Sequence, residues 1–324
     1  MRIGVVYPQT ELGSDVGALR AYASAVQELG YTHILAYDHV VGADPAVHTG
    51  WRGPYDVSTT FHEPFVMFGF LAALTTAELV TGIIILPQRQ TALVAKQAAE
   101  VDILCEGRFR LGIGAGWNAV EYTALAQPFS QRGKRMSEQI RLLRSLWTQP
   151  SITFHGEFDR IDGAGIAPLP VQRPIPIWIG GSSPAAYRRM GRLADGWFPQ
   201  VTPGEHLDAA LAIINDAATE AGRDPASIGM EGRVTCDPTN TDKFVRQVDS
   251  WRDVGASHLS INTMNAGCVG LDGHLAAIAL AATLCGVSPR PEPRGSPNLG
   301  IRVQLGIWTP AGICWVMQCG PPPP

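Results

Sequence analysis

An aspartate and a histidine stand together at the end of a predicted strand. The strand is His33–Tyr37, and Asp38 and His39 follow it directly or after one residue. Histidine changes its charge between about pH 5 and 8, so His39 could donate or accept a proton in a reaction. Asp38 could accept a hydrogen bond from a ligand, and the alternative is that it caps or closes a loop. The pair is a candidate catalytic site.

Three alternating glycines form a second candidate site. Gly112, Gly114 and Gly116 lie in the stretch LGIGAGWNAVEY, residues 111–122, and Trp117 follows them. A dinucleotide-binding fingerprint needs G-x-G-x-x-G with an immediate helix, but Trp117 stands at the last glycine position and we expect no helix directly after it. Glycines here would let backbone approach a flat ring closely, and the alternative is a tight turn without a ligand.

The third candidate site is a glycine- and serine-rich turn. Gly180, Gly181, Ser182 and Ser183 precede Pro184, which suits the first position of a helix. Free backbone N–H groups and the positive end of the helix dipole make such a turn an anion site. The alternative is a well-capped helix with no ligand, because serine before proline is also a good cap.

The elements that must position these residues alternate along the chain. Short apolar runs predict eight strands, each followed by a helix. An alternation of eight units predicts a (β/α)8 TIM barrel, with the three candidate sites at the carboxyl ends of its strands. The predicted strands are Arg2–Tyr7, His33–Tyr37, Thr81–Leu86, Phe109–Gly114, Ile175–Gly180, Gly196–Phe198, Ile228–Val234 and His258–Asn262.

Helical periodicity of apolar residues predicts the helices between these strands. The first of them is expected to begin near Asp15 and to end at Gly30. The other predicted helices are Phe65–Thr75, Ala92–Leu104, Met136–Trp147, Pro184–Leu193, His206–Ala221, Lys243–Val254 and His274–Leu284.

Three segments do not fit the alternation. Residues 41–62 form a long connection rich in Gly, Pro, His and Trp, which is typical of a functional loop. Residues 151–174 predict a polar surface hairpin. Residues 287–324 contain nine of the 25 prolines, so we expect a tail outside the barrel, disordered or read in a shifted frame. The barrel domain is then residues 1–286.

Composition excludes several functional classes. The chain of 324 residues has 45% hydrophobic and 17% charged residues, which is typical of a folded protein. A net charge of −4 provides no basic surface for nucleic acid. The first residues lack a signal peptide, and no apolar run is long enough for a membrane span. We therefore expect a cytoplasmic protein that acts on a small molecule.

The cysteines do not predict a metal site. The sequence contains no CxxC pair, and no histidine cluster lies near a cysteine. Reduced thiols are the expected state in a cytoplasm. The six cysteines are Cys105, Cys236, Cys268, Cys285, Cys314 and Cys319.

Four stretches together resemble the bacterial luciferase-like family of flavin- and deazaflavin-dependent oxidoreductases. They are YDHV (37–40), EGRFRLGIGAGWNAVEY (106–122), FSQRGKR (129–135) and IPIWIGGSSPAAYRRMGRLADGWFP (175–199). The resemblance covers about residues 1–285 and is greatest to the subgroup that uses the deazaflavin coenzyme F420, whose neighbours use FMN. It implies a TIM barrel that is usually a homodimer.

The resemblance also implies roles for the residues of the candidate sites. It places Asp38 and His39 close to the cofactor ring, with Gly114, Gly116 and Trp117 as a wall of the ring site. The turn of Gly180, Gly181, Ser182 and Ser183 would contact the cofactor phosphate. A non-prolyl cis peptide is expected near Ile83–Leu86.

Five further residues are assigned less directly. Arg89 would meet the cofactor tail or be a solvated surface charge. Glu63 would face the substrate or, as a helix N-terminal carboxylate, interact with the dipole. Trp197, Asn262 and Thr263 lie at the ends of predicted strands, so we expect them to line the substrate pocket.

The leading hypothesis is an oxidoreductase that transfers a hydride between coenzyme F420 and an unknown small organic substrate. The first alternative is an FMN-dependent monooxygenase that uses reduced FMN and O2. The second alternative, suggested by the unusual tail, is a non-catalytic deazaflavin-binding protein or an inactive family member.

Overall fold

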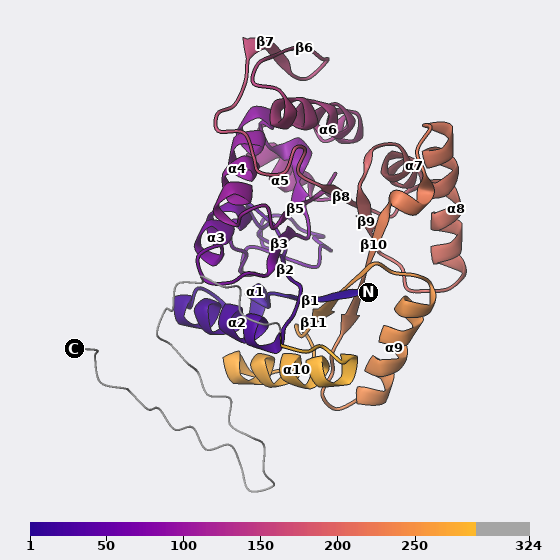
Figure 1. The fold of residues 1–324 in the computed structure, drawn as a ribbon. Helices are drawn as coiled ribbons and strands as arrows, with labels where there is room; N and C mark the ends of the chain where they lie inside the picture. Colours follow the sequence, from indigo (N-terminus) through magenta and orange to yellow (C-terminus); the bar gives the residue numbers. More distant parts are fainter. Residues whose placement is uncertain (290–324) are drawn as a thin grey trace, which may run out of the picture. The chain divides into compact units, whose positions relative to one another are not determined.

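Nine parallel strand segments close into a barrel at eight strand positions. The computed structural model describes residues 1–289. The order around the barrel is β3-β2-β1-β11-β10-β9-β8-β5-β4, and pairing of β3 with β5 closes it (Figure 1). The strands are β1 (Arg2–Val6), β2 (His33–Ala36), β3 (Glu78–Thr81), β4 (Ile84–Ile85), β5 (Phe109–Gly114), β8 (Ile177–Gly180), β9 (Gly196–Phe198), β10 (Gly229–Thr235) and β11 (His258–Asn262).

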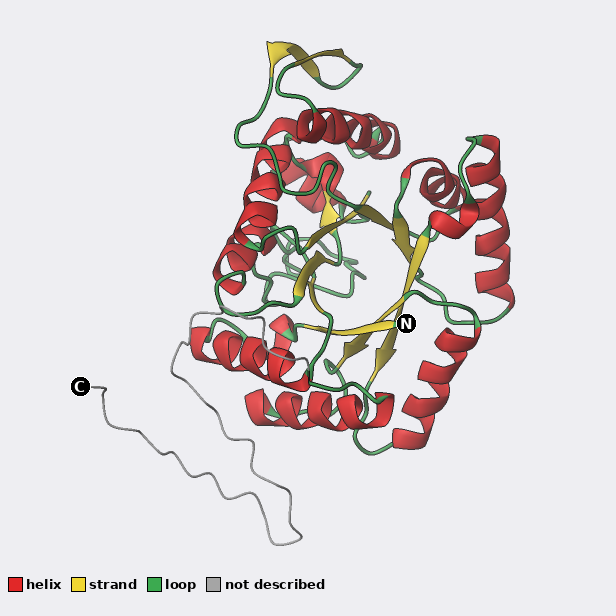
Figure 2. Cartoon of the chain, in the orientation of Figure 1, coloured by secondary structure: helices red, strands yellow, loops and turns green. Residues whose placement is uncertain are grey.

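Helices surround the barrel and cover its outer face (Figure 2). This arrangement confirms the predicted (β/α)8 fold. The helices are α1 (Gln9–Leu12), α2 (Val16–Leu29), α3 (Pro64–Leu71), α4 (Thr91–Leu104), α5 (Ala119–Ala124), α6 (Arg132–Thr148), α7 (Pro184–Leu193), α8 (Glu205–Glu220), α9 (Thr241–Asp253) and α10 (Gly270–Cys285), with 3-10 turns η1 (Leu86–Gln88) and η2 (Pro225–Ser227).

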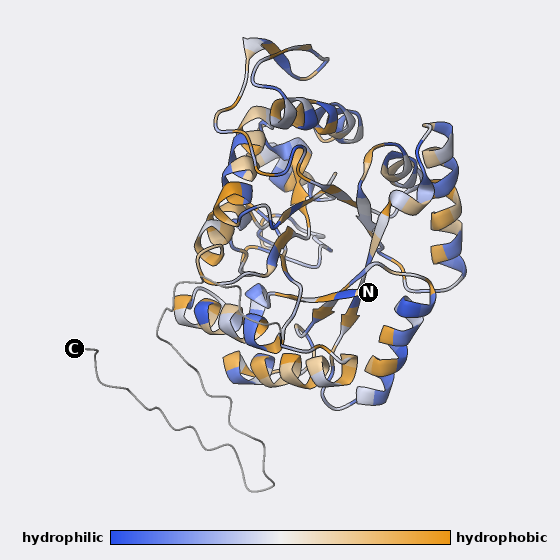
Figure 3. Ribbon diagram, in the orientation of Figure 1, coloured by the Kyte–Doolittle hydropathy of each residue, from blue (hydrophilic) through white to orange (hydrophobic). Residues whose placement is uncertain are grey.

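Local chemistry explains where these elements begin and end. All six residues of β5 are buried, as expected for a parallel strand covered on both faces. Asp15 caps the start of α2, because its side chain accepts a hydrogen bond from the backbone N–H of Gly17. The helix ends at Gly30, whose φ of 86° is the left-handed conformation that glycine adopts without strain. Figure 3 shows that α10 consists largely of apolar residues, whereas α9 mixes polar and apolar ones.

The predicted third strand differs most from the structure. Instead of Thr81–Leu86, strand β3 begins at Glu78 and is followed by a cis peptide between Gly82 and Ile83. The sequence did not indicate that the strand begins at Glu78, because a charged residue is not typical of a buried strand. In the structure, the Glu78 carboxylate pairs with Arg2 and Arg110. The cis bond lies directly before the region in which the sequence predicted it.

A short helix also contradicts the sequence prediction. We expected no helix directly after the alternating glycines, yet α5 begins at Ala119. The Asn118 side chain caps it by accepting hydrogen bonds from the N–H groups of Val120 and Glu121. Strand β5, which precedes this helix, belongs to a closed barrel. The fold therefore still excludes a dinucleotide-binding fingerprint at the alternating glycines.

The predicted hairpin is present, and a buried carboxylate of α6 holds its turn. Strands β6 (Ile152–His155) and β7 (Arg160–Ala164) pair in antiparallel fashion. The buried Glu138 of α6 accepts hydrogen bonds from the backbone N–H groups of Glu157, Phe158 and Asp159. Burial raises the pKa of Glu138, but these three bonds outweigh it and hold the pKa below its usual range.

Replacing Glu138 with alanine should therefore loosen the hairpin. Three backbone donors would lose their partner, and we expect the free energy of unfolding to fall by about 1 to 3 kcal/mol. Urea unfolding measures this change. The matched control is Glu157→Ala, which removes only an exposed ion pair with Lys134 and should cost less than about 1 kcal/mol. Equal losses in the two variants would contradict the anchoring role of Glu138.

The predicted tail, residues 287–324, lies outside the described residues except for its first three positions. Cys314 and Cys319 lie there as well. Within residues 1–289, no helix has the length and apolar character needed to cross a membrane.

Candidate functional site

A cavity of about 960 Å³ opens at the carboxyl ends of the barrel strands. This is the end at which TIM barrels carry their active sites. Asp38, His39 and the turn 180–183 all line it. From the alternating glycines, Gly114, Gly116 and Trp117 line the same cavity. The structure thus brings together the three sites that the sequence singled out separately.

The glycines at the strand ends make room for an isoleucine that projects over them. A Cβ atom added to Gly114 would lie 2.6 Å from Cδ1 of Ile83, and one added to Gly180 would lie 3.3 Å from Cγ2 of Ile83. Gly116 is related to Ile85 in the same way, at 2.7 Å. The glycines therefore seat the β3–β4 segment, and the half-buried Ile83 forms an apolar platform in the cavity.

Positive charge gathers at one end of the cavity, where a helix N-terminus and two arginines meet. Ser183 caps α7 by accepting a hydrogen bond from the N–H of Ala186 at 3.2 Å, so the positive end of this ten-residue helix faces the cavity. The guanidinium groups of Arg132 and Arg189 also line the cavity. Arg132 donates to the carbonyl of Gly116 at 3.2 Å, and Arg189 donates to the hydroxyl of Ser137 at 2.8 Å. These bonds hold both side chains in place without neutralising their charges.

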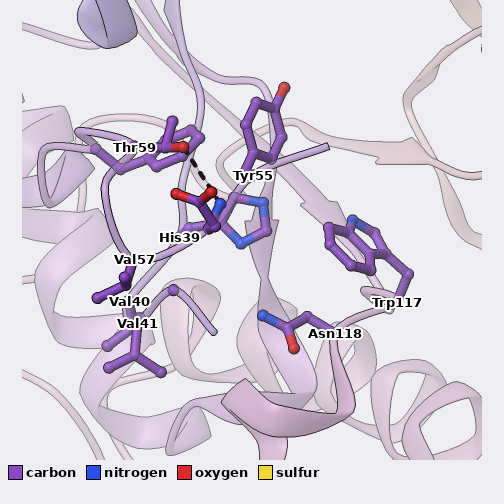
Figure 4. A pocket seen from close by; sticks show the side chains of 11 residues that line it. His39, Val40, Val41, Tyr55, Val57, Thr59, Trp117 and Asn118 are labelled. Atoms are coloured by element: carbon purple, nitrogen blue, oxygen red, sulfur yellow. Dashed lines mark hydrogen bonds between the residues drawn. The ribbon is translucent and has the colours of Figure 1, made fainter. Parts of the chain in front are cut away.

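His39 lies where the cavity meets a smaller pocket of about 160 Å³ (Figure 4). Its ring packs against Tyr55, Phe61 and Trp117, at centroid distances of 5.2, 4.9 and 5.9 Å. Trp51 extends this aromatic group, 5.5 Å from Trp117. The predicted loop 41–62 thus covers one side of His39 with aromatic side chains.

A buried glutamate orients the histidine. Oε2 of Glu121 lies 3.4 Å from Nδ1 of His39 and accepts a hydrogen bond from the Gln88 amide at 3.1 Å. The backbone N–H of Val40 donates to its other oxygen. Burial raises the pKa of Glu121, but the bonds from His39, Gln88 and Val40 outweigh this and lower it below its usual range. An ionised Glu121 accepts a hydrogen bond from Nδ1–H of His39, so Nε2 is the acceptor of the neutral ring.

Asp38 is engaged by an arginine. Both of its carboxylate oxygens accept hydrogen bonds from Nη2 of Arg89, each at 3.0 Å. Arg89 also pairs with Glu63 at 3.0 Å, and Glu63 caps α3 by accepting from the N–H of Val66. Burial raises the pKa of Asp38, and Arg89 opposes this shift. The three charges form a structural bridge between β2, η1 and α3 beside the cavity.

The floor of the cavity is a buried ion network. Glu231 and Ser260 line the cavity, and the Glu231 carboxylate accepts hydrogen bonds from Arg110, Ser260 and His33. Burial raises the pKa of Glu231, but Arg110 and His33 outweigh it and hold the pKa well below its usual range. Arg110 also lies 4.2 Å from the ring centre of Trp178. The barrel interior is thus closed below the cavity.

Comparison with known sequences places this site in a family. Residues 1–260 match the luciferase-like monooxygenases. The chain belongs to the luciferase-like monooxygenase family. This confirms the resemblance found from the motifs. Relatives of the chain include an F420-dependent dehydrogenase and an FMNH2-dependent monooxygenase.

Two relatives represent the two cofactors. The chain is 30% identical over 237 residues to the F420-dependent glucose-6-phosphate dehydrogenase of Nakamurella multipartita, which covers 71% of this chain and 66% of that protein. It is 34% identical over 164 residues to the FMNH2-dependent dimethylsulfone monooxygenase of Pseudomonas putida, with 49% and 44% covered. An uncharacterized protein of Mycobacterium tuberculosis is 40% identical over 164 residues, and the chain spans 56% of its length.

Solved structures of other enzymes share the fold. An F420-dependent secondary alcohol dehydrogenase in complex with an F420-acetone adduct superposes with a TM-score of 0.69 at 16% identity, covering 90% of this chain and 99% of that one. The EDTA monooxygenase of Chelativorans gives 0.69 at 13% identity, with 90% and 96% covered. At these identities the likeness establishes the fold alone.

Four predicted site residues of this luciferase-like chain do not line the cavity. Trp197 points away from it and packs against Tyr187 of α7, because strand β9 turns alternate residues to opposite faces. Thr263 is buried and hydrogen-bonded to His274 at 2.8 Å. Arg89 and Glu63 belong to the ion bridge with Asp38 described above.

Residues beside two of them line the cavity instead. The sequence had indicated Asn262 as a pocket residue, whereas Phe198 and Glu121 were missed. Phe198 and Asn262, next to Trp197 and Thr263, line the cavity. Glu121, three residues after Asn118, orients His39. The spacing of asparagine and glutamate at positions N-cap and N3 is a helix-start pattern, and it was the available signal for Glu121. Within residues 1–289, no group of three metal-ligating side chains gathers.

Proposed function

We propose that this luciferase-like chain is an oxidoreductase that transfers a hydride between coenzyme F420 and a small organic substrate. One observation carries the proposal. A single cavity combines an apolar platform at Ile83, an oriented histidine at His39 and an anion-binding end at Ser183. A flat ring with a phosphate-bearing side chain needs these three features in one continuous space.

The residues present fit such a cofactor. Ile83 would support the ring, and the wall would be formed by Gly116 and Trp117. The phosphate would bind at the N-terminus of α7 and between Arg132 and Arg189. A guanidinium stays charged even where burial lowers its pKa, as it does for Arg189. Both arginines are therefore suited to an anionic tail.

When bound, coenzyme F420 supplies a ring carbon that donates or accepts a hydride. The chain binds and orients the ring and moves one proton. In the direction of alcohol oxidation, Nε2 of His39 accepts the proton of the substrate hydroxyl, and Glu121 stabilises the resulting imidazolium. The aromatic side chains of Tyr55, Phe61 and Trp117 exclude water from that face of His39.

A second candidate function is FMN-dependent oxygenation. The identity of 34% with the dimethylsulfone monooxygenase favours it. FMN also carries a flat ring and a phosphate, so the same cavity would accommodate it. The greater length of the alignment with the F420-dependent dehydrogenase supports the deazaflavin as the first choice.

A paired titration tests the choice of cofactor. Purified protein is titrated with coenzyme F420 and, separately, with FMN, and the quenching of ring fluorescence gives each dissociation constant. We expect saturable binding of F420 that is at least about tenfold tighter than that of FMN, a difference of about 1.4 kcal/mol. Tighter binding of FMN would overturn the F420 assignment in favour of the monooxygenase. Binding of neither at saturating concentration would contradict both functions.

A further inference from the structure

An arginine projects into the cavity from the strand that also carries Glu231. Residues 231, 233 and 235 of β10 all line the cavity, as alternate positions of a strand should. Arg233 is solvent-exposed within this cavity, and no carboxylate lies within 4.0 Å of its guanidinium among residues 1–289. Because no carboxylate of the described residues pairs with it, Arg233 can pair with the negative charge of a bound ligand.

The carboxylates nearest in the cavity are already neutralised. Glu231, two residues before Arg233, accepts hydrogen bonds from Arg110, His33 and Ser260. Asp38 is held by Arg89. Both acidic groups that line the cavity are thus paired with other partners, and neither forms an ion pair with Arg233.

A tyrosine positions the guanidinium and offers a second donor. Nη1 of Arg233 donates a hydrogen bond to the Tyr37 hydroxyl at 3.1 Å, and its Cζ lies 5.6 Å from the ring centre. Burial raises the pKa of Tyr37, and Arg233 only partly opposes it, so the hydroxyl stays protonated at neutral pH. Because that oxygen accepts from Arg233, its own proton remains free to be donated.

The place of Arg233 separates it from the phosphate end. Arg132 lies on α6 and Arg189 on α7. Both donate hydrogen bonds to backbone carbonyls, and Arg189 also donates one to a serine hydroxyl. Arg233 lies on β10 and contacts Tyr37, which follows β2 and precedes His39 by two residues. The second cationic end of the cavity is therefore the end close to the proposed proton acceptor.

We propose that the substrate is an organic anion, and that its oxyanion group binds between Arg233 and Tyr37. The shared chemistry is that of a carboxylate or sulfonate, which a guanidinium binds through charge-assisted hydrogen bonds. Anchoring this group holds the rest of the substrate beside the ring that Ile83 would support, within reach of His39. This inference rests on the proposed function and names the substrate class of that same site.

Calorimetry with simple anions tests the proposal. Protein with and without saturating coenzyme F420 is titrated with acetate and with methanesulfonate, and the neutral acetamide and methanesulfonamide serve as matched probes. Ring fluorescence in the same samples reports cofactor binding independently. We expect at least one anion to bind, and the neutral probes to bind at least about tenfold more weakly, because they lose a charge-assisted bond. Which anion binds better distinguishes a carboxylate from a sulfonate substrate.

Two variants and a control assign the effect to this residue. Arg233→Met should weaken anion binding by about 10- to 100-fold, the value of a hydrogen bond to a charged group, and Arg233→Lys should keep part of it. Arg246→Met removes an exposed charge of α9 outside the cavity and should change nothing. The affinity for F420 should be the same in all four proteins.

Unchanged anion binding in Arg233→Met would overturn the proposal, and so would equal binding of neutral and anionic probes. The failure of the proposed function looks different. In that case F420 does not bind to any of the proteins, while the anion titration without cofactor still reports on Arg233.

Discussion

Replacing His39 with glutamine is expected to abolish most of the turnover and to leave cofactor binding intact. Glutamine keeps the approximate size of the ring but cannot take up a proton at neutral pH. Loss of a general base typically costs about 10² to 10⁴ in rate, so kcat should fall by that factor. The assay is F420 turnover by the substrate found by screening organic anions, with the dissociation constant of F420 measured by fluorescence.

Glu121→Gln is the variant that distinguishes proton transfer from packing. It keeps a hydrogen-bonding side chain beside Nδ1 of His39 but removes the charge that stabilises the imidazolium. We expect a loss of about tenfold or more in kcat, a difference of about 1.4 kcal/mol, with little change in KM.

A His39→Gln protein with at least half of the wild-type kcat would refute the role of His39.

Replacing Arg110 with methionine should destabilise the barrel more than any other single change considered. Arg110 is 2% exposed and pairs with Glu231 in the cavity floor. Without it, a buried carboxylate loses its main counter-charge, and breaking such a pair costs about 3 to 5 kcal/mol. Urea unfolding at neutral pH measures the loss. The double variant Arg110→Met/Glu231→Leu should recover much of it, because no charge then remains unpaired.

The pH dependence of this loss follows from Glu231. Its pKa is depressed in the folded protein, so its pairing contributes stability above the unfolded pKa of about 4.3 and loses it as the pH falls toward the folded value. The difference between wild type and Arg110→Met should therefore be largest above about pH 5 and should shrink toward pH 3. A difference that grows as the pH falls would contradict the network as described.

The sequence predicted the barrel because its signal is local. Buried strands read as short apolar runs and helices as apolar stripes, so all eight units were found. Most differ from the structure only at their ends, and the third strand is the exception, because it begins at Glu78. The glycines at the strand ends were recognised as a candidate site. That they are needed to make room for Ile83 could be seen only in the three-dimensional structure, because Ile83 comes from the distant β3–β4 segment. His39 was found because its position at a strand end places it at the active end of a barrel.

The parts that were missed depend on contacts between distant residues. Asp38 and Arg89 are 51 positions apart, and nothing local indicates that they pair. Trp197 was predicted to face the pocket, but the alternation of a three-residue strand gives that place to Phe198. Glu121 and Arg233 each look like an ordinary surface charge in the sequence. Only the fold buries Glu121 beside His39 and places Arg233 in the cavity.

A crystal structure of the protein with coenzyme F420 tests the central claim most directly. The account predicts the ring against Ile83, with its reacting edge toward His39, and the phosphate at the backbone N–H groups of the turn 180–183. Density for the ring outside the cavity, or for the phosphate at Arg233 instead of at that turn, would contradict it.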